Sequence, residues 1–235
     1  MNSDSVPIVT LCGFLGSGKT TLLRRWRRDA TLKDAPVIVH DLSEFGLDAE
    51  LLSDENSKPS PGHLVGGVAA LHGRHAREQL HDSAGEALEE ISALDPAPPL
   101  VLCESTGAAR PWPLIKAMTQ DKRFFLRHFI VTVDALNLHR DFEDGKILTG
   151  ASVSSQDLAQ RHVAEVLAEQ IAFASVIILT KIDTVPKPNV EDQVQILQAI
   201  QPQATIGLSA QAGILLPQLE TTPAPKLSVL ESRAN

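Results

Sequence analysis

Cysteine is scarce in this sequence, since Cys12 and Cys103 are the only two thiols among 235 residues. Two cysteines cannot build the disulfide framework of a small secreted domain, so we expect both to be reduced and buried. Basic residues are also in deficit: 21 Lys and Arg face 29 Asp and Glu, which leaves a net charge of −8. Nucleic acid and anionic membrane surfaces select proteins with a basic face, so neither is an expected partner.

The sequence also lacks long hydrophobic runs. None approaches the roughly 18 residues that cross a bilayer, and the first residues carry no basic segment ahead of an apolar stretch. A cytoplasmic location is therefore expected. With 43% hydrophobic residues, the chain is long enough for one large core. We expect one domain over residues 1–220, followed by a tail or linker over 221–235 with no second domain.

What the chain does contain is a series of short apolar segments separated by stretches with helical spacing. The apolar segments predict strands over 6–12, 36–41, 99–104, 129–135, 175–181 and 204–209. The intervening stretches predict helices over 18–29, 73–94, 111–121, 153–171, 189–201 and 214–220. Because the strands are rich in Val, Ile and Leu without polar alternation, helices should cover both faces of the sheet. The expected fold is therefore α/β, with a doubly wound, mostly parallel sheet.

Residues 42–66 do not fit this alternation. They mix acidic residues with Pro, Ser and Gly, which predicts a mobile loop.

The segment "GFLGSGKT" (13–20) matches G-x-x-x-x-G-K-[ST], with a predicted strand before it and a predicted helix after it. Its glycines let backbone N–H groups surround phosphate oxygens at the positive end of the helix. Lys19 is expected to reach the β and γ phosphates, and the Thr20 hydroxyl to bind Mg²⁺. An ordinary strand-to-helix turn is the alternative. The motif predicts a P-loop NTPase whose nucleotide-binding residues here are Gly13, Gly16, Ser17, Gly18, Lys19, Thr20 and Thr21.

A second motif, "LVLCESTG", ends a predicted buried strand with Glu104 and places Gly107 three residues later. A carboxylate there can hold the Mg²⁺ shell, and a glycine amide can sense the γ-phosphate. We expect Glu104 and Gly107 to act with Lys19 in catalysis. Acidic residues at strand ends are common, so this motif carries its meaning mainly together with the first.

The third motif, "IILTKID", brings Thr180, Lys181 and Asp183 to the carboxyl edge of the sheet, where ligands bind in open α/β folds. An Asp carboxylate accepts hydrogen bonds from N1–H and N2–H₂ of guanine, which adenine cannot supply, and the Lys stem can lie over the base. GTP is therefore expected rather than ATP. The alternative is a charged strand-to-loop transition. In "LSAQAG", the backbone around Ser209 and Ala210 is expected to face O6 of the base.

Several further residues have competing interpretations. In "HDLSEFGLD", Asp41 is a candidate Mg²⁺ ligand, and Glu44 and Asp48 are candidates for orienting water, or all three are solvated loop acids. Arg110 is either an arginine finger within the chain or a surface salt-bridge partner. Asp134 ends another strand at the ligand edge, with no role assigned.

The run "RRWRR" (24–28) has two readings. It forms either a nucleic-acid patch, with Trp26 stacking on a base, or the solvent face of a helix; the acidic composition favours the helix face.

Taken together, the segments "TLCGFLGSGKTTLLRRW", "VIVHDLSEFGLDAELL", "VLCESTGAARPWPLI", "IVTVDALN" and "QIAFASVIILTKID" resemble the CobW-type GTPases, relatives of the nickel-insertion GTPases of urease and hydrogenase. The resemblance covers about residues 6–215. It implies a GTP-hydrolysing metallochaperone or metal-cofactor insertase that uses GTP/GDP, Mg²⁺ and a transition metal such as Zn²⁺. The partners that it implies are a metalloenzyme client and a second copy in a homodimer.

One feature of that family is missing. Where its members carry Cys-x-Cys-Cys, a thiolate cluster suited to Zn²⁺, this chain has "GGVAALHGRH", with Val68, Ala70 and Leu71 at the matching places. His72 and His75 stand three apart and either form a replacement imidazole site or lie exposed on a helix. Glu44 is retained at a position that the family links to metal. A nucleotide-gated interaction protein, which docks a client when GTP orders residues 42–66, is therefore the alternative function.

Overall fold

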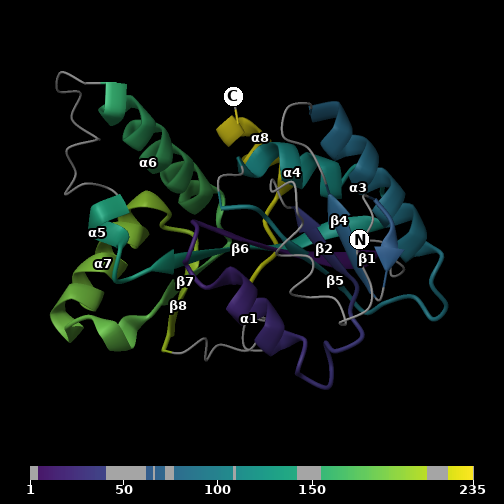
Figure 1. Cartoon of the computed structure of the whole chain (residues 1–235), viewed down its shortest axis with the longest axis horizontal. Helices are drawn as coiled ribbons and strands as arrows, with labels where there is room; N and C mark the ends of the chain where they lie inside the picture. Colours follow the sequence, from purple (N-terminus) through teal and green to yellow (C-terminus); the bar gives the residue numbers. More distant parts are fainter. Residues whose placement is uncertain are drawn as a thin grey trace.

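The computed structural model of the chain describes residues 5–40, 62–65, 67–71, 77–107, 110–141, 155–210 and 222–234. Within these residues, eight strands form one sheet in the order β3-β4-β2-β5-β1-β6-β7-β8 (Figure 1). The strands are β1 (Val6–Gly13), β2 (Val37–His40), β3 (Leu64–Val65), β4 (Val68–Leu71), β5 (Val101–Glu104), β6 (Phe124–Asp134), β7 (Val176–Thr180) and β8 (Thr205–Ser209). All neighbouring pairs are parallel except β3 and β4, which are antiparallel.

Helices connect most of these strands. They are α1 (Lys19–Trp26), α3 (Arg77–Ser92), α4 (Pro111–Met118), α5 (Leu138–Asp141), α6 (Ser155–Phe173), the 3₁₀ helix η2 (Ile182–Thr184), α7 (Lys187–Ile200) and α8 (Leu227–Ala234). None of the helices in the described ranges is both long and apolar enough to span a membrane.

The predicted mostly parallel α/β fold is confirmed, and all six predicted strands are present. The strand predicted over 129–135 begins earlier, at Phe124. Its first residues were not predicted because polar Arg127 and His128 interrupt the apolar run. The short strands β3 and β4 were not predicted. Strand β3 lies within 42–66, so the prediction of a loop over that whole range is wrong at Leu64–Val65. The helix predicted over 214–220 lies outside the described residues.

Both faces of the sheet are buried, as the apolar strands predicted. On one face, Leu22, Leu23 and Trp26 of α1 pack on alternate strand residues such as Val9 and Val39. The intervening strand residues belong to two further clusters, which include residues of α3, α4, α6 and α7. In Figure 1, α1 accordingly lies on one side of the sheet, with α3, α4 and α6 on the other.

Two side-chain interpretations are decided by this packing. Trp26 is fully buried under the sheet, so its ring cannot stack on a base, whereas Arg24 and Arg25 beside it are exposed. Cys12 and Cys103 are free and fully buried, and burial raises the pKa of each thiol above its usual value. Both cysteines are therefore small core residues in the protonated form.

The segment that we expected to be a tail or linker contains helix α8. Leu230 is only 2% exposed and joins the core cluster that contains Phe173. The approach to α8 is also fixed, because Arg127 donates a hydrogen bond of 2.9 Å to the carbonyl of Thr222. Residues 222–234 therefore pack against the sheet domain, and the domain boundary at residue 220 stays a prediction.

We predict that Leu230→Ala lowers the free energy of unfolding by about 2–3 kcal/mol, because it removes buried apolar contacts with the core cluster that contains Phe173. Leu227→Ala is the matched control on the same helix, since Leu227 is 40% exposed; it should change stability by less than about 0.5 kcal/mol. Urea denaturation measures both values. Equal effects of the two substitutions would show that α8 does not pack through Leu230.

Candidate nucleotide-binding site

The loop between β1 and α1 is shaped by three glycines with positive φ: Gly13 (138°), Gly16 (77°) and Gly18 (96°). Gly18 is the N-cap of α1 in the left-handed conformation, and its carbonyl accepts the hydrogen bond of Leu22 N–H at 2.9 Å. The first turn of α1 contains no acidic residue. The partial positive charge at this helix end is therefore not offset by a carboxylate of the first turn itself, which suits an anion.

Gly13 packs directly against β6. A Cβ at this position would lie 2.3 Å from the carbonyl oxygen of Thr132, so no side chain fits. The Thr132 hydroxyl lies 2.6 Å from the Ser17 hydroxyl and donates to the Cys12 carbonyl at 3.2 Å. Thr132 thus holds both ends of the loop, a role that sequence reasoning missed because a threonine within an apolar strand looks like a packing residue.

Lys19 and Thr20 begin α1 with buried or half-buried side chains. Lys19 is 7% exposed and donates a hydrogen bond of 3.1 Å to the Phe14 carbonyl, which places its ammonium group over the loop. The Thr20 hydroxyl donates to Glu104 Oε1 at 2.6 Å, and Glu104 is 1% exposed. A hydroxyl and a carboxylate side by side are the hard oxygen ligands that Mg²⁺ prefers, so these residues fit that ion. Thr21 is exposed.

Gly107 lies against the backbone of the same loop. A Cβ at Gly107 would stand 2.7 Å from the backbone nitrogen of Leu15, so glycine is required there by contact rather than by backbone conformation. Gln170 on α6, fully buried, donates to the Gly107 carbonyl at 3.2 Å. Arg110 lies 3.7 Å from Glu169 on the same helix, a contact that agrees with the salt-bridge interpretation of this arginine.

The "TKID" segment lies at the same edge of the sheet as the phosphate-loop candidate. The Thr180 hydroxyl donates to the Ser17 carbonyl at 2.9 Å and to the Val133 carbonyl at 3.1 Å. Thr180 pairs in register with Asp134 on β6 and with Ser209 on β8. The two motifs therefore share one edge of the sheet, as a single nucleotide that contacts both would require.

Beyond Thr180, the chain turns sharply at Lys181, which has left-handed φ and ψ of 56° and 30°. Asp183 then lies exposed on η2, where a ligand can reach its carboxylate. Ser209 is buried, and its hydroxyl has no hydrogen-bond partner within the described part of the chain. Ala210, next to it, is exposed. These residues form one border of the candidate site.

Asp134 is a site residue to which sequence analysis assigned no role. Its Oδ2 lies 2.6 Å from Lys181 Nζ and accepts from Asn137 Nδ2 at 2.6 Å, and its Oδ1 accepts from Leu136 N–H at 2.9 Å. The available signal was an acidic residue at the end of a buried apolar strand. It indicates the ligand edge without naming the partner.

The positions that would hold thiolates in the resembled family lie in the core. Val68, Ala70 and Leu71 belong to β4 and are at most 1% exposed. No group of three or more His, Cys, Asp or Glu side chains that could hold a metal gathers among the residues described above. Five sequence candidates lie outside the described residues: Asp41, Glu44, Asp48, His72 and His75.

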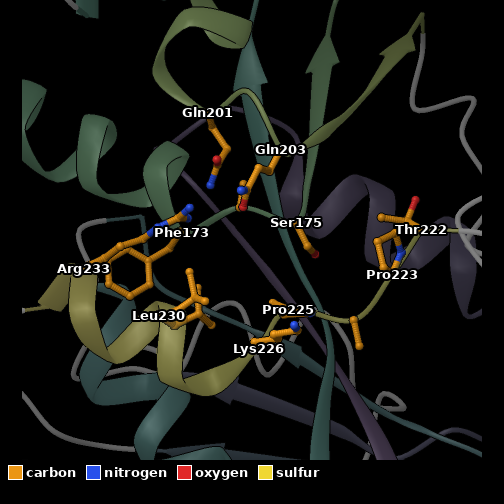
Figure 2. Close-up of a pocket in the computed structure, with 13 residues that line it drawn as sticks. Phe173, Ser175, Gln201, Gln203, Thr222, Pro223, Pro225, Lys226, Leu230 and Arg233 are labelled. Atoms are coloured by element: carbon orange, nitrogen blue, oxygen red, sulfur yellow. The ribbon is translucent and has the colours of Figure 1, made fainter.

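A cavity of about 550 Å³ lies at the amino ends of β7 and β8, next to α8 (Figure 2). Ser175 and Gln203, which line it, come just before β7 and β8, whereas the nucleotide candidates follow the strands. Phe173, Leu230 and Arg233 line it from α6 and α8. This cavity is therefore separate from the site built around the glycine loop.

We predict that Gly13→Ala lowers the free energy of unfolding by more than about 3 kcal/mol, because the new Cβ meets the Thr132 carbonyl at a φ of 138°. Gly16→Ala is the control: it shares a positive φ but has nothing within 4 Å of its Cβ, so only about 1–2 kcal/mol should be lost. Thermal or urea unfolding measures the difference. A loss at Gly16 as large as the loss at Gly13 would contradict the close packing on Thr132.

The chain is similar to curated proteins that are named for zinc. The chain is 25% identical over 235 residues to the zinc-regulated GTPase metalloprotein activator 1 of Dictyostelium discoideum, covering 93% of this chain and 49% of that protein. It is 29% identical over 195 residues to the zinc chaperone CobW of Pseudomonas aeruginosa, covering 76% of this chain and 49% of that protein. The chain thus spans about half the length of these curated relatives.

Among solved structures, the Zn(II)-bound YjiA GTPase of E. coli superposes with a TM-score of 0.57 at 22% identity, covering 100% of this chain and 70% of that one. This likeness supports the fold. The model of the nucleotide-binding domain of CobW/HypB/UreG matches residues 7–207, which is well over half of the sequence. The chain therefore belongs to the CobW/HypB/UreG family and carries its nucleotide-binding domain.

Proposed function

We propose that this protein binds GTP together with Mg²⁺ and hydrolyses it. The observation that carries the proposal is the hydrogen bond from Thr180 to Ser17, which joins the loop proposed for the base to the loop proposed for the phosphates. The Thr20–Glu104 hydrogen bond brings the "LVLCESTG" motif to the same edge. Membership of a nucleotide-binding family, one of whose curated members is named a GTPase, supports the same reading. The proposal keeps the cytoplasmic location that the sequence predicts.

In this mechanism, the amides from Gly13 to Thr20 hold the phosphate oxygens, and the Lys19 ammonium group moves from the Phe14 carbonyl to the β and γ phosphates. Thr20 and Glu104 would hold Mg²⁺, which neutralises charge that develops on the phosphates. Gly107 offers its amide to the γ-phosphate because it already lies against the loop backbone at Leu15. Glu44 and Asp48 stay proposed as the residues that orient water.

Guanine selection falls to Asp183, whose exposed carboxylate accepts two hydrogen bonds from N1–H and N2–H₂. Adenine presents no such pair of donors. Lys181 would lie over the ring with its alkyl stem, and Ser209 and Ala210 would face O6. Thr180 contributes indirectly, because its hydroxyl is engaged by the Ser17 and Val133 carbonyls.

We further propose that GTP turnover serves metal insertion into a metalloenzyme client, since the relatives are named a zinc-regulated metalloprotein activator and a zinc chaperone. Zinc would then be cargo. Its ligands cannot come from Val68, Ala70 and Leu71, whose side chains are hydrocarbon and buried. His72 and His75 are the proposed replacement ligands.

A second candidate function is favoured by the same observation. Because the thiolate positions have become part of the core in β4, the protein can act as a nucleotide-gated docking module without a metal. GTP would then order the part of residues 42–66 that precedes β3 for a client, and a homodimer is one assembly that such a module would form.

The base and phosphate assignments are tested by nucleotide binding. We expect GTP to bind at least 100-fold more tightly than ATP, since a site that hydrogen-bonds one base leaves its polar groups unpaired with another. Lys19→Ala should lose at least about 100-fold in GTP affinity. Asp183→Asn should exchange guanine for xanthine selectivity, because the amide donates to the O2 of xanthine while its oxygen still accepts from N1–H. Titration of fluorescent nucleotides measures all three, and equal affinity for ATP and GTP would refute the assignment of Asp183.

Metal cargo and simple docking are separated by a second measurement. If the protein carries metal, Zn²⁺, Co²⁺ or Ni²⁺ should bind the GTP-loaded form with a Kd below about 1 μM, and a His72→Ala/His75→Ala variant should lose at least about tenfold. His81→Ala is the control, since His81 lies exposed on α3. Calorimetry measures the affinities, and the GTP turnover rate is followed with each metal. Binding weaker than micromolar favours the docking function.

A further inference from the structure

Asp134 lies where strand β6 ends, between the loops that follow β1 and β7. Its carboxylate is only 5% exposed, so it is removed from most of the water that would otherwise solvate its charge. Burial of a carboxylate is costly unless hydrogen-bond donors or cations replace the lost water. Here those groups are the Leu136 N–H, the Asn137 amide and the Lys181 ammonium.

Two of these donors belong to the loop that follows β6 itself. Leu136 N–H holds Oδ1 at 2.9 Å and Asn137 Nδ2 holds Oδ2 at 2.6 Å, so the orientation of the carboxylate is fixed by its own neighbours. Lys181 is the partner from another segment, the turn that follows β7, with its Nζ 2.6 Å from Oδ2. The Asp134 carboxylate is therefore held in place by its own loop, and it in turn holds the Lys181 ammonium group.

Lys181 adopts a backbone conformation that side chains rarely take. It is the one non-glycine residue with positive φ within the described ranges, and such a conformation costs about 1–2 kcal/mol. The turn lets the chain pass from β7 into η2, which carries Asp183, while the Lys181 side chain reaches Asp134 on β6. The ion pair offsets part of that conformational cost.

We propose that Asp134 is a positioning residue for nucleotide binding: it holds the Lys181 ammonium group so that the alkyl stem of this lysine is preorganised as the surface on which the purine lies. The proposal rests on the proposed function. Lys181 is still 38% exposed, so its stem can contact a ligand while its ammonium group stays with Asp134. Preorganisation of a side chain with four rotatable bonds removes an entropic cost from binding.

The Asp134–Lys181 pair is also linked to the glycine loop proposed for the phosphates. Ala135, which follows Asp134, donates its N–H to the carbonyl of Thr180, which precedes Lys181, at 3.0 Å. The Thr180 hydroxyl continues to the Ser17 carbonyl. Since Thr180 already fixes the phosphate loop through its own hydroxyl, loss of Asp134 should affect the base and leave phosphate binding intact.

The test uses the full chain with Asp134→Asn, which keeps the shape and removes the charge, with Lys181→Met, which keeps most of the stem, and with both together. Glu191→Gln is the control, because it removes an exposed carboxylate whose distance to Lys187 is 4.0 Å. The Kd for fluorescent GDP is measured directly, and inorganic tripolyphosphate is measured by displacement.

We expect Asp134→Asn to raise the Kd for GDP about tenfold while the affinity for tripolyphosphate changes by less than about twofold. The double variant should bind GDP within about twofold of Lys181→Met alone, because the two residues act as one unit. Glu191→Gln should bind like the wild type. If Asp134→Asn does not fold, Lys181→Met is expected to give the same selective loss of GDP.

The proposal is overturned by an unchanged Kd for GDP in Asp134→Asn, by an equal loss of tripolyphosphate affinity, or by a full effect of Asp134→Asn in the Lys181→Met background. Each of these results requires a wild-type protein that binds GDP. A wild-type protein that does not bind GDP would instead refute the proposed function, so the two failures are distinct.

Discussion

The hydrogen bond from the Thr180 hydroxyl to the Ser17 carbonyl joins the end of β7 to the glycine loop, 163 residues away in the chain. Such a bond contributes only about 1 kcal/mol by itself. Its position matters more than its strength, since β1, β6 and β7 are parallel neighbours whose carboxyl ends lie at one edge of the sheet. The glycine loop, Asp134 and the "TKID" segment all lie where these strands end at this edge, which is where ligands bind in open parallel sheets.

Close packing of backbone on backbone is the second constraint on the site. Gly13 faces the Thr132 carbonyl, and Gly107 faces the backbone of Leu15, so a Cβ at either glycine would collide with main-chain atoms. Gly16 serves a different purpose, because its Cβ would meet nothing and only its positive φ favours glycine. Glycine is thus needed at Gly13 and Gly107 because no side chain fits, and at Gly16 because the backbone has a positive φ.

This chain has the residues proposed for nucleotide binding but lacks thiolates at the positions expected for a metal. The groups proposed to handle a nucleotide lie together, with Lys19, Thr20 and Glu104 buried or half-buried around one loop. The positions that correspond to a thiolate cluster are filled by hydrocarbon side chains of β4 and pack in the core. If metal delivery is retained, it must use other ligands. If it is lost, the nucleotide cycle is left to control docking.

The sequence by itself determined the α/β class, the six main parallel strands and the three motifs, because long apolar runs and glycine spacing are local signals. It did not determine β3, β4 or the packing of α8, since short strands and a terminal helix are stabilised by contacts rather than by their own composition. It placed Asp134 at the ligand edge without a role, and it did not single out Thr132. Only the tertiary structure decided that Asp134 holds Lys181 and that Thr132 holds the glycine loop, because each partner comes from a distant segment that strand pairing brings within hydrogen-bond distance.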